Sequence, residues 1–212
     1  MKNLTLVVIA CIALFGGVWF ANGLMVPKEP EHARLYPKPR SIGEVNLVDQ
    51  NGESVTAEWF EGKWTLTFVG YTFCPDICPT TLGELKAIYP QLQAIDSEYP
   101  IEIMFMSVDP QRDTVARLKQ YIDFFNPEFH AVTGEHKALF PVVRAMGMMY
   151  SFPDSTETED YLVDHSASVV IINPRGEVVG RFMPQRKPGQ VSISEGAQIV
   201  ADMPTLVASF KG

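Results

Sequence analysis

The chain has 212 residues, with 25 Asp and Glu against 17 Lys and Arg, and its formal net charge is −8. An acidic chain without a run of basic residues is not expected to bind nucleic acid. We find no internal repeat and no low-complexity segment, so the folded part is expected to be one domain of ordinary size.

The first 40 residues divide into two segments. Residues 4–26 contain no charged side chain, and a helix of this length would cross the hydrocarbon core of a bilayer. This apolar run is longer than that of a cleaved signal peptide, so we predict an N-terminal transmembrane helix within residues 1–26. Residues 27–40 contain four prolines and several charges, and they are predicted to form an extended tether. The folded domain would then occupy residues 41–212.

The rest of the chain alternates between strand and helix patterns. Runs of β-branched and aromatic residues predict strands at residues 45–48, 64–71, 101–108, 129–132, 166–172 and 177–182. Helical spacing of apolar residues and capping signals predict helices at residues 80–95, 113–125, 133–146 and 192–210. This order predicts an α/β domain in which helices flank a central mixed β-sheet. Cys74 and Cys78 follow a predicted strand at the start of a predicted helix, the position of the reactive thiols in a thioredoxin-like fold, so this fold is predicted.

Local signals predict where some of these elements begin. Asn51-Gly52 is a strong hairpin signal. Asp113 and Thr133 are candidate N-caps of the second and third helices. Ser192 and Glu195 have the spacing of a capping box before the last helix.

Two cysteines stand between a predicted strand and a predicted helix. Cys74 and Cys78 lie in the stretch YTFCPDICPT, residues 71–80. Residues four apart share one face of a helix, and their Cα atoms, about 6 Å apart, are within the range of a disulfide. A helix N-terminus also lowers the pKa of a thiol. The pair could therefore be a redox couple, a metal clamp, or both, whereas a purely structural disulfide would gain little from so short a loop.

Two thiolates make an incomplete site for most metals, so we looked for a third ligand among the histidines. Thiolates favour Cu(I), zinc or iron–sulfur clusters. His165 lies in YLVDHSASVVII, directly before a predicted buried strand. In a thioredoxin-like fold the loop that enters this strand faces the cysteine turn. His165 is therefore the candidate third ligand, and the alternative is a structural histidine.

Two aspartates lie next to these candidates. Asp164 either orients the imidazole of His165 through a hydrogen bond or belongs to a turn. Asp76 either places a charge near the cysteines or is favoured by the dipole of the first helical turn. The methionines of the stretch MGMM at residues 146–149, together with Met104 and Met106, are interpreted as core side chains. Met183 follows the last predicted strand and could lie near the site.

Three blocks of the sequence resemble one known family, the Sco/SenC family. They are FVGYTFCPDICPTTL at residues 68–82, SVDPQRDT at 107–114 and YLVDHSASVVIINPRGEVVGRF at 161–182. The resemblance implies a membrane-anchored, thioredoxin-like protein that binds copper, as Cu(I) or Cu(II), through Cys74, Cys78 and His165. It also implies a role in assembling the dinuclear copper site of cytochrome c oxidase subunit II.

The resemblance leaves two cellular locations, the bacterial periplasm and the mitochondrial intermembrane space. Positive charges flank both ends of the apolar segment, so they do not decide its orientation. The start MKN lacks the Arg- and Ser-rich character of a mitochondrial transit segment. We therefore expect a bacterial inner-membrane protein with its domain in the periplasm.

The expected function is that of a copper metallochaperone. Its partners would be subunit II of cytochrome c oxidase or a related copper oxidase, an upstream copper donor and a thiol reductant. The alternative is an enzyme, a thiol-disulfide oxidoreductase that uses Cys74 and Cys78 as a catalytic pair to reduce the cysteines of the client copper site. A copper-dependent redox sensor is a third hypothesis.

Overall fold

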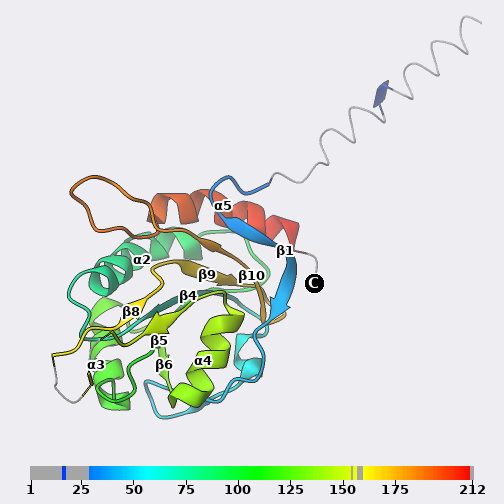
Figure 1. Ribbon diagram of the computed structural model, residues 1–212. Coiled ribbons are helices and arrows are strands. Elements are labelled where there is room, and N and C mark those ends of the chain that lie inside the picture. Colours follow the sequence, from blue (N-terminus) through cyan, green and yellow to red (C-terminus); the bar gives the residue numbers. More distant parts are fainter. Residues whose placement is uncertain (1–15, 18–28, 154, 157–159, 211–212) are drawn as a thin grey trace, which may run out of the picture.

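A mixed β-sheet runs through the centre of the domain (Figure 1). The computed structural model describes residues 16–17, 29–153, 155–156 and 160–210, and within them eight strands form this sheet in the order β1-β10-β9-β4-β5-β6-β2-β3. The strands are β1 Arg34–Ser41, β2 Leu47–Asp49, β3 Ser54–Val55, β4 Trp64–Gly70, β5 Ile101–Ser107, β6 His130–Thr133, β9 Val169–Ile172 and β10 Glu177–Phe182. Strand β4 pairs in parallel with β5 and antiparallel with β9, so the predicted mixed sheet is confirmed.

Helices cover both faces of the sheet. They are the 3-10 helix η1 Ala57–Phe60 and the α-helices α2 Ile77–Gln93, α3 Val115–Phe125, α4 His136–Ala145 and α5 Gly196–Ser209. Helices α2, α3 and α5 contribute to one hydrophobic cluster, and α4 contributes to the other. Because successive strand residues point to opposite faces, Phe68 lies in the first cluster and its neighbour Val69 in the second. The central strand β4 is buried along its whole length.

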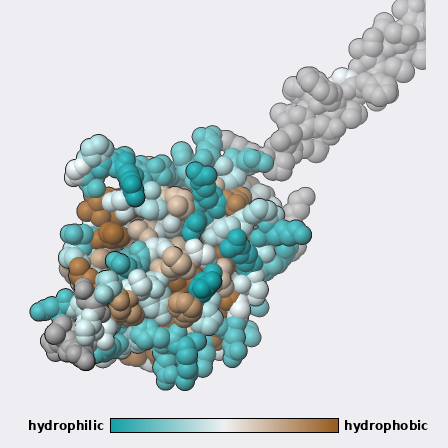
Figure 2. Space-filling view, in the orientation of Figure 1, coloured by the Kyte–Doolittle hydropathy of each residue, from teal (hydrophilic) through white to brown (hydrophobic). Residues whose placement is uncertain are grey.

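Some large apolar side chains reach the surface of this domain. Figure 2 shows brown, hydrophobic areas among the teal, hydrophilic side chains of the viewed face. Within the described ranges the exposed large hydrophobic residues are Leu35, Phe73, Phe124, Phe140, Met149, Leu162 and Val191. Single exposed apolar residues are common in proteins, so each needs a second observation before it indicates a function.

The predicted strands and helices are found, but several helices begin elsewhere than predicted. Helix α2 begins at Ile77, earlier than the predicted residue 80. Thr114, rather than Asp113, caps α3, because the Asp113 carboxylate is buried and accepts hydrogen bonds from Thr72 and Ser107.

The other two predicted caps were also wrong. The N-cap of α4 is Glu135, because the hydroxyl of Thr133 is buried and donates to the Ser107 carbonyl. The N-cap of α5 is Glu195, and the Ser192 hydroxyl donates to the Gln185 carbonyl instead of to a helix end. In each case a contact with another part of the chain uses the side chain that was predicted to cap.

The segment predicted as a tether is in large part attached to the domain. Residues 34–40 belong to β1, which pairs antiparallel with β10. Just before it, the backbone N–H groups of Glu31, His32 and Ala33 donate to the carboxylate of Asp202 at 3.0, 2.7 and 2.7 Å. The sheet therefore begins at Arg34 rather than after residue 40.

The predicted membrane span lies almost entirely outside the described residues. Of residues 4–26, only Gly16 and Gly17 are described. Within the described part of the chain, no helix has both the length and the apolar character needed to cross a membrane.

Candidate metal centre

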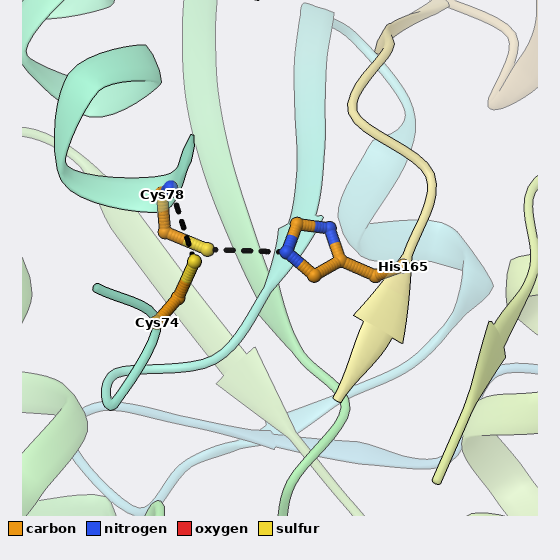
Figure 3. A group of neighbouring side chains, drawn as sticks. All are labelled: Cys74, Cys78 and His165. Carbon is orange, nitrogen blue, oxygen red and sulfur yellow. Dashed lines mark hydrogen bonds between the residues drawn. The ribbon is translucent and has the colours of Figure 1, made fainter. Parts of the chain in front are cut away.

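The cysteine pair lies in the connection from the central strand β4 to helix α2. The backbone N–H of Cys74 donates to the Tyr71 carbonyl at 3.3 Å, which turns the chain out of the strand. Cys78 is in the first turn of α2, and Cys74 comes just before the helix. The backbone N–H of Cys78 donates to the Cys74 sulfur at 3.4 Å (Figure 3). The two side chains thus face each other, as predicted, although Cys74 itself is not helical.

A buried carboxylate holds this connection in place. The Asp113 side chain accepts from the Thr72 backbone N–H at 2.8 Å, from the Thr72 hydroxyl at 2.7 Å and from the Ser107 hydroxyl at 2.5 Å. Burial raises the pKa of Asp113, against the lowering effect of these hydrogen bonds. Sequence reasoning missed this role. The stretch SVDPQRDT could have indicated it. This stretch follows β5 as the cysteine connection follows β4, and the carboxyl ends of neighbouring parallel strands meet at one edge of a sheet.

His165 reaches the cysteines from a separate two-stranded sheet. Strand β8 (Asp164–His165) pairs antiparallel with β7 (Tyr150–Ser151), with His165 opposite Tyr150. The imidazole packs edge-on against the rings of Phe68 and Tyr71, with centroids 5.8 and 5.9 Å away. Its Nε2 atom lies 3.4 Å from the Cys78 sulfur (Figure 3). The predicted approach of His165 to the cysteine turn is therefore found.

The three candidate ligand atoms form one group. The sulfurs of Cys74 and Cys78 and a ring nitrogen of His165 all lie within 4.8 Å of one another. No disulfide bond joins Cys74 and Cys78 in this structure. Two thiol sulfurs and one imidazole nitrogen are a donor set that suits Cu(I), and small side-chain movements would bring all three to one ion.

The two thiols differ in their environment and therefore in their acidity. The pKa of Cys74 is lowered to about 4, first by the hydrogen bond from Cys78, with further lowering by His165 and against the effect of burial. Burial raises the pKa of Cys78, and its contact with Cys74 raises it further. Without metal, Cys74 is accordingly a half-buried thiolate and Cys78 a buried thiol.

Neither of the two neighbouring aspartates reaches the site with its carboxylate. Asp164 is exposed, and the atom that faces Nδ1 of His165 is the Ser166 carbonyl oxygen, 3.3 Å away. The interpretation of Asp164 as the partner that orients the imidazole is therefore not supported. Asp76 is the exposed N-cap residue of α2 without a side-chain cap bond, and its carbonyl accepts from Thr80. Its position agrees with the interpretation as a residue of the helix start.

The remaining candidates are placed away from the site. His130 pairs with Glu102 at 3.1 Å, and His136 contacts the Tyr150 hydroxyl at 3.0 Å. Within the described residues the side chains of five methionines are buried, as the core interpretation requires: Met104, Met106, Met146, Met148 and Met203. Met149 differs, because it is 71% exposed.

Fold and site together define a class of protein. It is a thioredoxin-like domain that brings a cysteine pair and a histidine together for soft-metal or thiol chemistry. The family model described as SCO1/SenC matches residues 34–199, and the chain belongs to this family. The resemblance seen in the three sequence blocks is thus confirmed.

Individual relatives agree with this assignment. The chain is 32% identical over 186 residues to "Protein SCO2 homolog, mitochondrial" of Bos taurus, covering 84% of this chain and 68% of that protein. The structure of Arabidopsis thaliana ScoI with copper bound is similar with a TM-score of 0.68 and 29% identity, over 79% of this chain and 98% of that chain. Bradyrhizobium japonicum ScoI with copper bound has a TM-score of 0.63 and 32% identity, over 78% and 98%.

Proposed function

We propose that this protein binds copper through Cys74, Cys78 and His165 and delivers it to a client protein during cytochrome oxidase assembly. The observation that carries the proposal is the grouping of two sulfurs and an imidazole nitrogen within 4.8 Å. Such a set of soft and borderline donors holds Cu(I) well. Two similar structures contain copper. Cu(I) is the form proposed for transfer, and Cu(II) is the second oxidation state to test.

The exposure of the ligands suits release of the metal to a partner. Cys78 is fully buried and Cys74 is half-buried. Three protein ligands leave a side of the ion open, and a partner ligand could enter there and replace Cys74 first. Both thiols must be reduced for this, so a Cys74–Cys78 disulfide would prevent copper loading.

The metal site can be tested with the reduced protein in the absence of oxygen. A competing chelator would measure the Cu(I) affinity of the wild type, His165→Ala and Cys78→Ser. We expect one tightly bound equivalent in the wild type and an affinity lower by about a hundredfold or more in both variants, which corresponds to about 3 kcal/mol. His32→Ala is the matched control, because His32 is exposed in the N-terminal segment. An unchanged affinity in His165→Ala would disprove this ligand set.

The proposed client is the dinuclear copper site of cytochrome c oxidase subunit II. Membership in the SCO1/SenC family supports this choice. The direct experiment mixes the Cu(I)-loaded protein with the reduced, copper-free copper-site domain of subunit II. Appearance of the spectrum of the assembled copper centre is the expected result. Retention of all copper by the donor would reject subunit II as the acceptor.

A second candidate function is reduction of a client disulfide. The observation that favours it is the unequal exposure of two facing thiols, with Cys74 accessible and Cys78 buried behind it. Cys74 would attack the client disulfide, forming a mixed disulfide and releasing one client thiolate. Cys78 would then attack Cys74, releasing the second client thiol and leaving a Cys74–Cys78 disulfide for an external thiol reductant. Stoichiometric reduction of an oxidised client peptide without copper would support this function, and unreactive client disulfide would exclude it.

We also propose that the apolar segment at residues 4–26 anchors the domain to the bacterial inner membrane, with the domain in the periplasm. The charge-free composition of this segment supports the proposal. A reporter enzyme that is active only in the periplasm, fused after Gly212, would be active if the orientation is right. Activity only of a cytoplasmic reporter at the same position would reverse the topology.

A further inference from the structure

An aromatic side chain lies exposed directly beside the candidate copper ligand Cys74. Phe73 is 47% exposed, whereas the two preceding residues, Tyr71 and Thr72, are buried. The guanidinium carbons of Arg112 and Arg117 lie 4.9 and 5.0 Å from the centre of the Phe73 ring. Contact with two guanidinium groups restricts the movement of this ring, which lowers the entropy cost of binding a partner against it.

The two guanidinium groups differ in how their charge is balanced. Arg112 forms an ion pair with Asp109, with Nε and Oδ2 only 2.6 Å apart, and stacks 3.5 Å above the Tyr161 ring. Arg117 donates from Nε to the Thr72 hydroxyl at 3.1 Å. In the part of the chain that the structure describes, no carboxylate lies within ion-pair distance of Arg117. Among the described residues Arg117 therefore carries a positive charge that no carboxylate pairs with directly, and Asp113 is connected to it only through the shared Thr72 hydroxyl. The protein as a whole has a net charge of −8.

The position of this pair matters because copper transfer requires contact. An accepting ligand has to reach the ion itself, and the accessible ligand is Cys74, since Cys78 is buried. Phe73 directly precedes Cys74, so the Cα atoms of the two residues are about 3.8 Å apart. A partner that reaches the metal at Cys74 would therefore come near the exposed Phe73 ring and the guanidinium beside it.

We propose that Phe73 and Arg117 form the docking surface for the copper-accepting protein, and that this partner carries a carboxylate beside its own metal-binding cysteines. The inference rests on the proposed function, since it names the chemistry of the acceptor surface. Aromatic and arginine side chains are frequent anchors of protein interfaces. A guanidinium binds a carboxylate through two parallel hydrogen bonds, which selects both the charge and the orientation of the partner.

The experiment uses the full chain loaded with Cu(I) and two synthetic acceptor peptides. Each peptide carries two cysteines, flanked by Glu in one peptide and by Gln in the other. At low salt we expect the wild type to deliver copper to the Glu peptide about fivefold faster than to the Gln peptide, with the difference decreasing as salt is added. Arg117→Gln should bring the ratio of the two rates close to one. Lys119→Gln, a charge change on the same helix, should keep the wild-type ratio.

The aromatic part of the surface has its own matched pair of variants. Phe73→Ala should slow transfer to both peptides by about fivefold, because it removes an interface anchor. The control, Phe124→Ala, removes a different exposed ring, which lies on α3 two helical turns beyond Arg117. It should leave both rates unchanged. Cu(I) affinity, measured with a small chelator, should stay within about twofold of the wild type in Phe73→Ala and Arg117→Gln, because neither residue is a ligand.

Two outcomes would overturn the proposal. One is equal wild-type rates for the two peptides, and the other is a preference for the Glu peptide that survives Arg117→Gln. A general distortion of the loop by Arg117→Gln would slow both peptides equally and keep their ratio, so it cannot imitate the expected result. Failure of the proposed function is distinguishable, because it would appear as absence of transfer to the subunit II domain while the peptide preference persists.

Discussion

At the scale of single residues, the two cysteines show how position gives different chemistry to one side chain. Cys78 is enclosed by the core and keeps its proton, because burial disfavours a thiolate. Cys74, before the helix, accepts hydrogen bonds from Cys78 and becomes the thiolate. The asymmetry gives one accessible nucleophile or metal ligand and one protected partner.

This asymmetry predicts the effect of removing the hydrogen-bond donor. The hydrogen bond from Cys78 is the largest cause of the low pKa of Cys74, and Cys78→Ala removes it. The pKa of Cys74 should therefore rise from about 4 towards the ordinary thiol value of about 8.5. The pH dependence of alkylation would measure this in reduced, copper-free protein. The third cysteine of the chain, Cys11 in the N-terminal apolar segment, would be changed to Ser in every variant. A Cys74 profile that stays in the acidic range would show that Cys78 is not the cause.

Gly70, the last residue of β4, keeps space open for the site. A Cβ atom added there would lie 2.5 Å from the Cys78 sulfur and 2.9 Å from the Phe105 ring. We expect Gly70→Ala to destabilise the fold by about 1–3 kcal/mol in urea unfolding, because overpacking displaces buried neighbours. Gly83→Ala in α2 is the control, since nothing lies within 4 Å of its added Cβ and alanine favours the helix. Equal stabilities of the two variants would contradict the close packing at Gly70.

At the scale of elements, the site depends on contacts between segments that are distant in sequence. The connection from β4 to α2 is held by Asp113, which lies after β5. His165 is held by the pairing of β8 with β7. The sequence pattern identified the strands and helices on either side, but it misassigned Asp113 as a cap. A polar residue before a helix has the same local signature whether it caps that helix or binds a neighbouring strand.

Replacing Asp113 by Ala tests its role in the cysteine connection. The change would leave the Thr72 N–H and the hydroxyls of Thr72 and Ser107 without their acceptor. Since buried donors without partners cost about 1–3 kcal/mol each, we expect a loss of about 3 kcal/mol in the free energy of unfolding. We also expect weaker Cu(I) binding.

The control for Asp113 is Asp123→Ala, which removes a surface ion pair with Lys119. Such pairs contribute about 0–1 kcal/mol. If both variants lost equally little stability, the buried network would not be what holds the cysteine connection.

At the scale of the whole molecule, the N-terminal segment is joined to the last helix. Asp202 of α5 is buried, and it binds the three successive backbone N–H groups that precede β1. This clamp fixes where the chain enters the domain. An upstream anchor would therefore be connected to a defined point beside α5 rather than through a free tether of 14 residues.

Asp202→Ala should release that entry point. We expect a loss of about 2 kcal/mol in the free energy of unfolding, because hydrogen bonds to a charged acceptor are stronger than average. Hydrogen exchange should also become faster at residues 31–33. Asp96→Ala, at an exposed position, should change neither. Unaltered protection at residues 31–33 in Asp202→Ala would refute the clamp.

The sequence by itself determined the class of fold, the cysteine pair, the candidate histidine and the family resemblance. These follow from local periodicity and from short blocks of side chains whose spacing is independent of the rest of the chain. Only the tertiary structure decided the entry of residues 34–40 into the sheet, the roles of Asp113 and Asp202, and the position of Arg117 beside Phe73. Each of these depends on which partner a polar group finds across the fold, and sequence spacing does not encode that partner.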